Sequence, residues 1–123
     1  MKPTFTIGIE EEYQTIDPET RDLRSHIHAE ILEKGKLLLQ ERVKAEMHQS
    51  VVEVGTGVCK NIKEAKVEVK MLRRDIIRLA KENGLRLASV ATHPFSDWRT
   101  QDINPDDRYK NILRICNWWR ARI

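Results

Sequence analysis

The stretch Thr4–Ile16, with the sequence TFTIGIEEEYQTI, combines the pattern of a β-strand with three consecutive carboxylates. In a strand, side chains two positions apart share a face. Glu10 and Glu12 therefore share one face, while Glu11 and Tyr13 share the other. Two carboxylates roughly 7 Å apart on one face repel each other unless a cation lies beside them. The stretch predicts either a divalent-cation site or an edge strand whose acids face water.

A third carboxylate is expected from a second strand region. Alternation of apolar and polar residues returns over residues 43–54 and predicts one bent strand or two short ones. We expect Val52 to pack in the core, which places Glu53 on the opposite face. A neighbouring strand would then bring Glu53 beside Glu10 and Glu12. Carboxylate oxygens are the ligands that Mg²⁺ prefers.

The clearest helix is predicted over residues 61–83, where apolar residues recur at steps of three and four. Asn61 is its expected N-cap, and Glu64 is placed to complete a capping box. A buried strand is expected next, over residues 85–91. It delivers His93 to the strand-to-loop transition, where binding groups are often found.

Two further helices are predicted with less regular patterns. Residues 27–38 predict a short helix that is interrupted near Gly35. A terminal helix is expected over residues 105–123, with Asn104 as its N-cap and Pro105 at the first helical position. Together these elements predict an α+β fold, a mainly antiparallel sheet with helices packed on one face.

Composition predicts a globular protein, and a cytoplasmic location is the default expectation where the sequence shows no targeting or membrane segment. Its 123 residues predict a single domain over residues 1–123, and 40% of them are hydrophobic while 33% are charged. No apolar run is long enough for a membrane span, and the amino terminus lacks the pattern of a signal peptide. The two cysteines are expected to stay reduced. A net charge of +3 suits an anionic ligand but does not by itself indicate one.

Three stretches of the chain resemble, in the same order, the amino-terminal part of carboxylate-amine ligases of the glutamate–cysteine ligase type 2 family. They are Ile7–Tyr13 with Asp17–Thr20, His48–Cys59, and Ala91–Trp98 followed by Arg108 and Tyr109. The resemblance implies a glutamine-synthetase-like fold. It also implies an enzyme that couples ATP cleavage to the formation of an amide bond between a carboxylate and an amine.

The resemblance also implies roles for individual residues. Glu10, Glu12 and Glu53 match the positions that hold the divalent ions, Mg²⁺ in the expected case, which bridge the phosphates of ATP. His93 is expected either to contact substrate or phosphate, or to be a satisfied structural residue. Arg108 is expected either to bind a substrate carboxylate in bidentate fashion or to form a surface ion pair with neighbouring acids.

Family members are longer than this chain, and the resemblance covers only their amino-terminal third. The family's later His-x-His strand and the remaining nucleotide-site elements lie outside it, so we expect the isolated chain to be incomplete or inactive as a ligase. The alternative is a non-enzymatic interaction module. An exposed apolar helix face and an unpaired strand edge would favour a homodimer. The basic residues of helix 61–83 are interrupted by acids, which predicts a solvated face and not a nucleic-acid surface.

Overall fold

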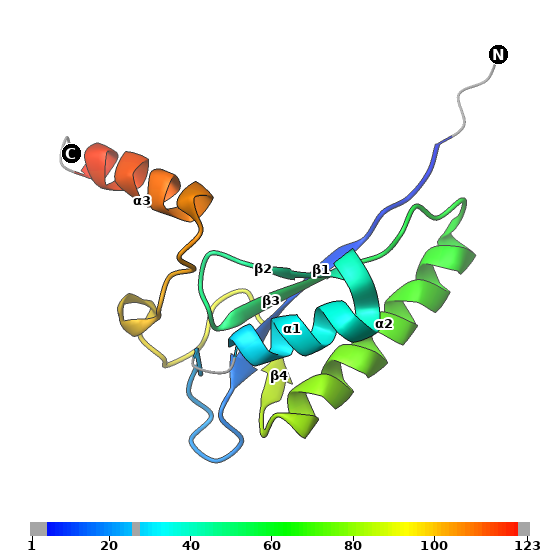
Figure 1. The fold of residues 1–123 in the computed structure, drawn as a ribbon, viewed down its shortest axis with the longest axis horizontal. Helices are drawn as coiled ribbons and strands as arrows, with labels where there is room; N and C mark the ends of the chain where they lie inside the picture. The colour runs from blue at the N-terminus through cyan, green and yellow to red at the C-terminus, as the bar shows by residue number, and fades with distance from the viewer. Residues whose placement is uncertain (1–4, 26–27, 121–123) are drawn as a thin grey trace.

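The computed structural model describes residues 5–25 and 28–120. Within these residues, four strands form one antiparallel sheet in the order β2-β3-β1-β4 (Figure 1). The strands are β1 (Glu10–Ile16), β2 (Val43–Ala45), β3 (Val51–Gly55) and β4 (Arg86–Ala88). The predicted α+β fold with an antiparallel sheet is confirmed. The alternation over residues 43–54 predicts one bent strand or two short ones, and the structure has two separate strands there, β2 and β3.

Two helices, α1 (His28–Leu39) and α2 (Ile62–Glu82), cover the same face of the sheet (Figure 1). The core lies between these layers, where apolar side chains of the strands alternate inward. Val52 is 0% exposed, as predicted, Val54 is 1% exposed, and both pack with the apolar stripe of α2. The residues of that stripe in the core are Leu72, Ile76, Leu79 and Ala80.

The ends of α2 follow the predicted chemistry with one correction. The Asn61 side chain accepts the backbone N–H groups of Lys63 and Glu64, so it is the N-cap. The Glu64 carboxylate does not reach back to the backbone of Asn61 as a capping box requires. It accepts instead from the backbone N–H of Lys60 at 2.7 Å. Gly84 ends the helix with φ +69°, a conformation that glycine adopts without strain.

Several basic side chains on the exposed face of α2 form ion pairs. Arg73 pairs with Glu11 of β1, and Arg74 lies 3.0 Å from Asp75. Arg78 lies 3.9 Å from Asp75. These three arginines therefore have acidic partners within the chain, and the solvated character of the whole helix face stays a prediction.

The predicted interruption at Gly35 is wrong, because α1 continues through it to Leu39. Gly35 is buried, and a Cβ atom there would lie 3.2 Å from Val43 Cγ1 and 3.4 Å from Leu79 Cδ2. The glycine therefore allows α1 to approach β2 and α2 closely. A short 3₁₀ helix, η1 (Gln40–Arg42), follows and leads into β2.

The predicted strand 85–91 is shorter than expected and lies at an edge. Of this stretch, only β4 pairs with another strand. Within the described residues that strand is β1, so β4 has a neighbour on one side only. Leu85 is buried at 3% exposed, but Ser89, Val90 and Ala91 are exposed. Burial of the whole stretch would need a neighbour on its other side. A second 3₁₀ helix, η2 (Trp98–Thr100), follows this segment.

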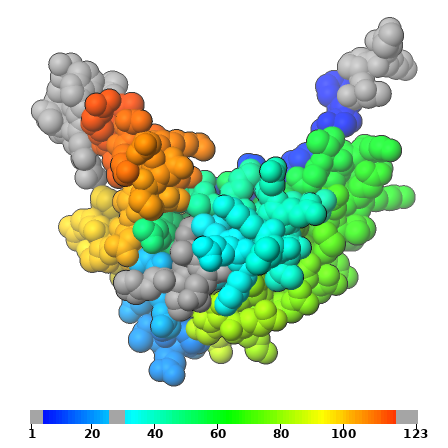
Figure 2. All heavy atoms as spheres, in the orientation of Figure 1, coloured from blue at the N-terminus to red at the C-terminus, as the bar shows by residue number. Residues whose placement is uncertain are grey.

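Helix α3 (Asp107–Arg120) extends away from the sheet, as Figures 1 and 2 show. Its start differs from the prediction, because Asp106 and not Asn104 accepts the N–H of Arg108 at 2.8 Å. Asn104 makes the same kind of contact two residues earlier, where its Oδ1 accepts the N–H of Asp106 at 3.1 Å. The buried Tyr109 anchors the helix by donating its hydroxyl to Ala45 O at 3.1 Å. The predicted helix end at residues 121–123 lies outside the described residues.

Among the described residues, no helix combines the length and the apolar character needed to cross a membrane.

Candidate metal centre

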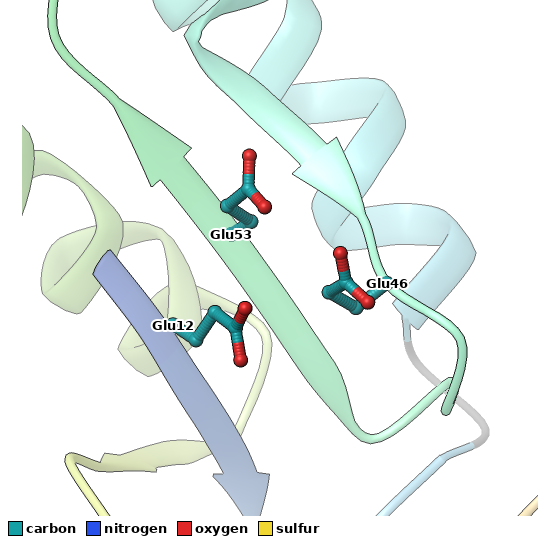
Figure 3. Close-up of side chains that lie close together, drawn as sticks. All are labelled: Glu12, Glu46 and Glu53. Carbon is teal, nitrogen blue, oxygen red and sulfur yellow. The ribbon is translucent and has the colours of Figure 1, made fainter. Parts of the chain in front are cut away.

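Three carboxylates converge on the face of the sheet opposite α1 and α2. Glu12 comes from β1, Glu53 from β3, and Glu46 from the residue after β2 (Figure 3). Each offers one ligand oxygen, and these oxygens all lie within 4.8 Å of one another. Together with Glu10 they define what we call the acidic face.

The sheet register produces this convergence. Glu12 and Glu53 are direct partners in the antiparallel pair of β1 and β3. Partners in such a pair have their side chains on the same face and close together. Lys44 is the partner of Glu53 on the other side, in β2. Glu46 follows Lys44 by two residues and therefore continues on the same face.

Of the predicted carboxylates, Glu12 and Glu53 belong to this group, whereas Glu10 is held apart. Glu10 Oε1 accepts from Lys44 Nζ at 3.0 Å, and the same ammonium donates to Glu53 Oε1 at 2.9 Å. Glu46 was missed as a site residue. The signal was present, because the alternation that places Glu53 on one face also applies to the stretch containing Glu46.

The carboxylates repel one another. Glu12 is exposed, but partial desolvation of its carboxyl, followed by the charges of Glu46, Glu53 and Glu10, raises its pKa above the ordinary value. Conversely, hydrogen bonds to Glu53 and Glu10 raise the pKa of Lys44 and hold it charged. The acidic face thus carries excess negative charge around Glu12.

The three-carboxylate group suits a hard divalent cation. Mg²⁺ binds oxygen ligands at about 2.1 Å, so two oxygens on opposite sides of one ion lie about 4.2 Å apart. Oxygens that already lie within 4.8 Å of one another need only small side-chain rotations to reach that geometry. The chemistry of the donors and their spacing therefore fit Mg²⁺.

A cavity of about 480 Å³ adjoins the carboxylates and is lined by both Glu12 and Glu46. Gln14, Ser50 and Gln101 also contribute to its wall. Among the described residues, Gln14 Oε1, Ser50 Oγ and Gln101 Oε1 are buried polar atoms without a hydrogen-bond partner. Buried polar atoms are usually paired, so the wall of this cavity has unused hydrogen-bonding capacity.

His93 also lines the cavity, but its ring is engaged in the fold. Its Nδ1 accepts the backbone N–H of Ser96 at 3.1 Å, and its Nε2 lies 2.9 Å from the backbone oxygen of Arg21. Since Nδ1 is an acceptor, Nε2 must carry the proton and donate to Arg21. These contacts join the chain after β4 to the turn after β1. A contact of His93 with substrate stays a prediction.

Arg108 lies in the first turn of α3 and is exposed. Its guanidinium carbon is 5.6 Å from the centroid of the Tyr109 ring. It does not line the cavity beside the carboxylates. Its predicted binding of a substrate carboxylate is therefore not supported by proximity within the described residues, and it stays a prediction.

Comparison with known proteins agrees with the resemblance seen in the motifs. The family model described as glutamate-cysteine ligase family 2 matches residues 6–122. A protein of Solibacter usitatus named "Putative glutamate--cysteine ligase 2" is 69% identical over 113 residues, which are 92% of this chain and 29% of the relative. A protein of Herpetosiphon aurantiacus with the same name is 57% identical over 109 residues, 89% of this chain and 28% of the relative. The chain thus spans less than a third of these relatives, and it belongs to glutamate-cysteine ligase family 2.

Proposed function

We propose that this chain provides the cation-binding part of an ATP-dependent carboxylate-amine ligase. The observation that carries the proposal is the convergence of Glu12, Glu46 and Glu53 beside a cavity with unpaired polar atoms in its wall. The relatives are named as glutamate–cysteine ligases, which supports this class of reaction.

In the proposed reaction, a substrate carboxylate attacks the γ-phosphate of ATP, and an amine then displaces phosphate from the acyl phosphate to form the amide. Glu12, Glu46 and Glu53 would hold Mg²⁺, which neutralises phosphate charge when bound. Glu10 contacts the same Lys44 ammonium as Glu53 and so borders this group. His93 keeps the segment that borders the cavity in place through its two backbone contacts.

The complete reaction is proposed for the longer relatives and not for these 123 residues alone. The chain spans 28–29% of those proteins, and the cavity has open sides. We propose that the isolated chain binds Mg²⁺ with ATP weakly and forms no amide.

Calorimetric titration of the chain with ATP, with and without Mg²⁺, tests this proposal. We expect binding that requires Mg²⁺ and that is lost in the double variant Glu12→Gln/Glu53→Gln. Glu11→Gln is the matched control, because Glu11 adjoins Glu12 in sequence but faces α2. Absence of Mg²⁺-dependent binding by the wild type, or its persistence in the double variant, would contradict the proposal.

A second candidate function is self-association, favoured by exposed apolar residues on α3 and by the two edges of the sheet. Ile112 and Ile115 of this outlying helix are 37% and 56% exposed. The edge strands β2 and β4 each pair on one side only within the described residues. We propose that two copies associate through the apolar residues of α3 or through these strand edges. Size-exclusion chromatography with light scattering should show a dimer at micromolar concentration, and a stable monomer would exclude it.

A further inference from the structure

Lys44 places a positive charge inside the acidic face. Its Nζ atom lies 3.0 Å from Glu10 Oε1 and 2.9 Å from Glu53 Oε1. Glu53 is at the same time a member of the group with Glu12 and Glu46. One carboxylate is therefore shared between an ammonium group of the chain and the candidate cation site.

The ammonium neutralises only part of this face. Glu10, Glu12, Glu46 and Glu53 carry four negative charges when ionised, against the one positive charge of Lys44. Lys44 contacts Glu10 and Glu53, whereas the excess negative charge remains around Glu12 and Glu46. A divalent ion bound there would share Glu53 with the ammonium and would be repelled by it.

We propose that Lys44 is a tethered cation that competes with a divalent ion for Glu53, and that it thereby sets how tightly the acidic face binds such ions. The inference rests on the proposed cation site and adds the residue that tunes it. In this arrangement the ammonium moves away from Glu53 when an ion binds.

The exposures of the three side chains make this movement feasible. The side chains of Lys44 and Glu10 are 53% and 64% exposed, and exposed ion pairs contribute little to stability. The Lys44 side chain is long and flexible, so its ammonium can turn into water at small cost. The Glu53 side chain is only 12% exposed and projects from the middle of β3, so it stays at the site.

The opposite role for Lys44 makes an opposite prediction. If the ammonium served to orient Glu53 for the ion, its removal would weaken cation binding. Competition instead predicts a gain in affinity when the charge is removed. Such a gain would not result from general damage to the fold.

Titration of the full chain with Mn²⁺ alone, followed by the electron paramagnetic resonance of free Mn²⁺, separates these roles. We expect Lys44→Met to lower the Kd by about fivefold to tenfold, from the repulsion of a divalent ion by a nearby charge. Lys44→Arg retains the charge and should stay within about twofold of the wild type. Lys70→Met, which removes a charge from the exposed side of α2, should also stay within about twofold.

The outcomes distinguish this inference from the proposed function. If the wild type binds Mn²⁺ and Lys44→Met binds equally or more weakly, competition by Lys44 is excluded while the cation site stands. If only Lys44→Met binds, competition is supported in its strongest form. If neither protein binds, both the site and the inference are overturned.

A second measurement uses the wild type and so does not depend on the folding of a variant. Brief acylation with an amine-reactive reagent, followed by mass spectrometry, reports how free each ammonium group is. Saturating Mn²⁺ should raise the reactivity of Lys44 severalfold and leave that of Lys70 unchanged. Equal reactivity of Lys44 with and without the ion would show that the ammonium is not displaced.

Discussion

Glu11 and Glu12 are adjacent in the sequence, but their side chains lie on opposite faces of the sheet and in opposite electrostatic environments. Glu11 accepts from Arg73 Nε at 2.9 Å and from the Tyr13 hydroxyl at 2.7 Å. The Arg73 hydrogen bond is the largest influence on this carboxyl and lowers its pKa. The pKa of Glu12 is raised by partial desolvation and by the charges of three other acids.

The difference shows that one face of a strand can pack against a helix while its other face carries charge that a ligand could neutralise. On the covered face, helix α2 supplies the counter-charge, and burial with the Glu11 hydrogen bond raises the pKa of Tyr13 to about 12. On the acidic face, the described residues place one ammonium group, that of Lys44, against four carboxylates. The remaining charge is available for a ligand. Each prediction below tests this contrast between the two faces.

The largest effect is expected in the core beneath the covered face. Ile76 of α2 is 0% exposed and packs against the sheet, so Ile76→Ala should lower the free energy of unfolding by about 2–5 kcal/mol. Ile77 is 55% exposed, and Ile77→Ala should change it by less than about 0.5 kcal/mol. Urea denaturation measures both. Similar losses for the two variants would mean that α2 does not pack as described.

Two glycines give the next comparison. A Cβ atom at Gly35 would lie 3.2 Å from a methyl group of the buried Val43, whereas one at Gly8 has no atom within 4 Å. Gly35→Ala should lower the free energy of unfolding by about 1 kcal/mol, because the crowding exceeds the gain in helix propensity. Gly8→Ala should have an effect below about 0.5 kcal/mol. Thermal denaturation of both variants is the test. Stabilisation by Gly35→Ala would show that the Val43 side chain moves aside to accommodate the added methyl group.

The two adjacent carboxylates should respond to neutralisation with opposite signs. Near neutral pH and without divalent ions, Glu12→Gln should raise the free energy of unfolding by about 0.5 kcal/mol, because Glu12 lies directly opposite Glu53. Glu11→Gln should lower it, because the variant loses the pairing with Arg73. Urea denaturation in the presence of a chelator measures both changes. Changes of the same sign would remove the electrostatic contrast between the faces.

The pH ranges of these two effects should also differ. The folded-state pKa of Glu12 lies above the ordinary value of 4.5, so its contribution to stability is greatest at low pH and is lost as the pH rises through the raised pKa. The folded-state pKa of Glu11 lies below 4.5, so its contribution is present above 4.5 and is lost as the pH falls through the lowered pKa.

Unfolding measured across the acid range, for the wild type and both variants, tests this prediction. The advantage of Glu12→Gln should disappear by the time the pH has fallen to about 4.5, whereas the deficit of Glu11→Gln should persist below that value. A common midpoint for the two effects would contradict the assigned environments.

The amino-acid pattern was sufficient to predict much of the candidate site. Alternation places Glu10 and Glu12 on one face of β1 and Glu53 on the face of β3 opposite the core residue Val52, because a strand has a period of two whatever its neighbours are. Helix α2 follows from its apolar spacing and from Asn61, both of which act locally. The family was also recognisable from the order of the three motifs.

Other features depended on contacts between distant segments. Gly35 is a helix breaker by propensity, but here it permits α1 to approach Val43 and Leu79. Whether Glu10 or Glu46 joins Glu12 and Glu53 is decided by the register of β2 against β3 and by the reach of Lys44. Side chains far apart in sequence share a site only when pairing aligns them.

The sequence alone determined on which face of its own strand each carboxylate lies, because side-chain alternation is a property of each strand. Only the tertiary structure decided which of them form one group, because the distance between oxygens depends on strand register and on the placement of Lys44 between Glu10 and Glu53.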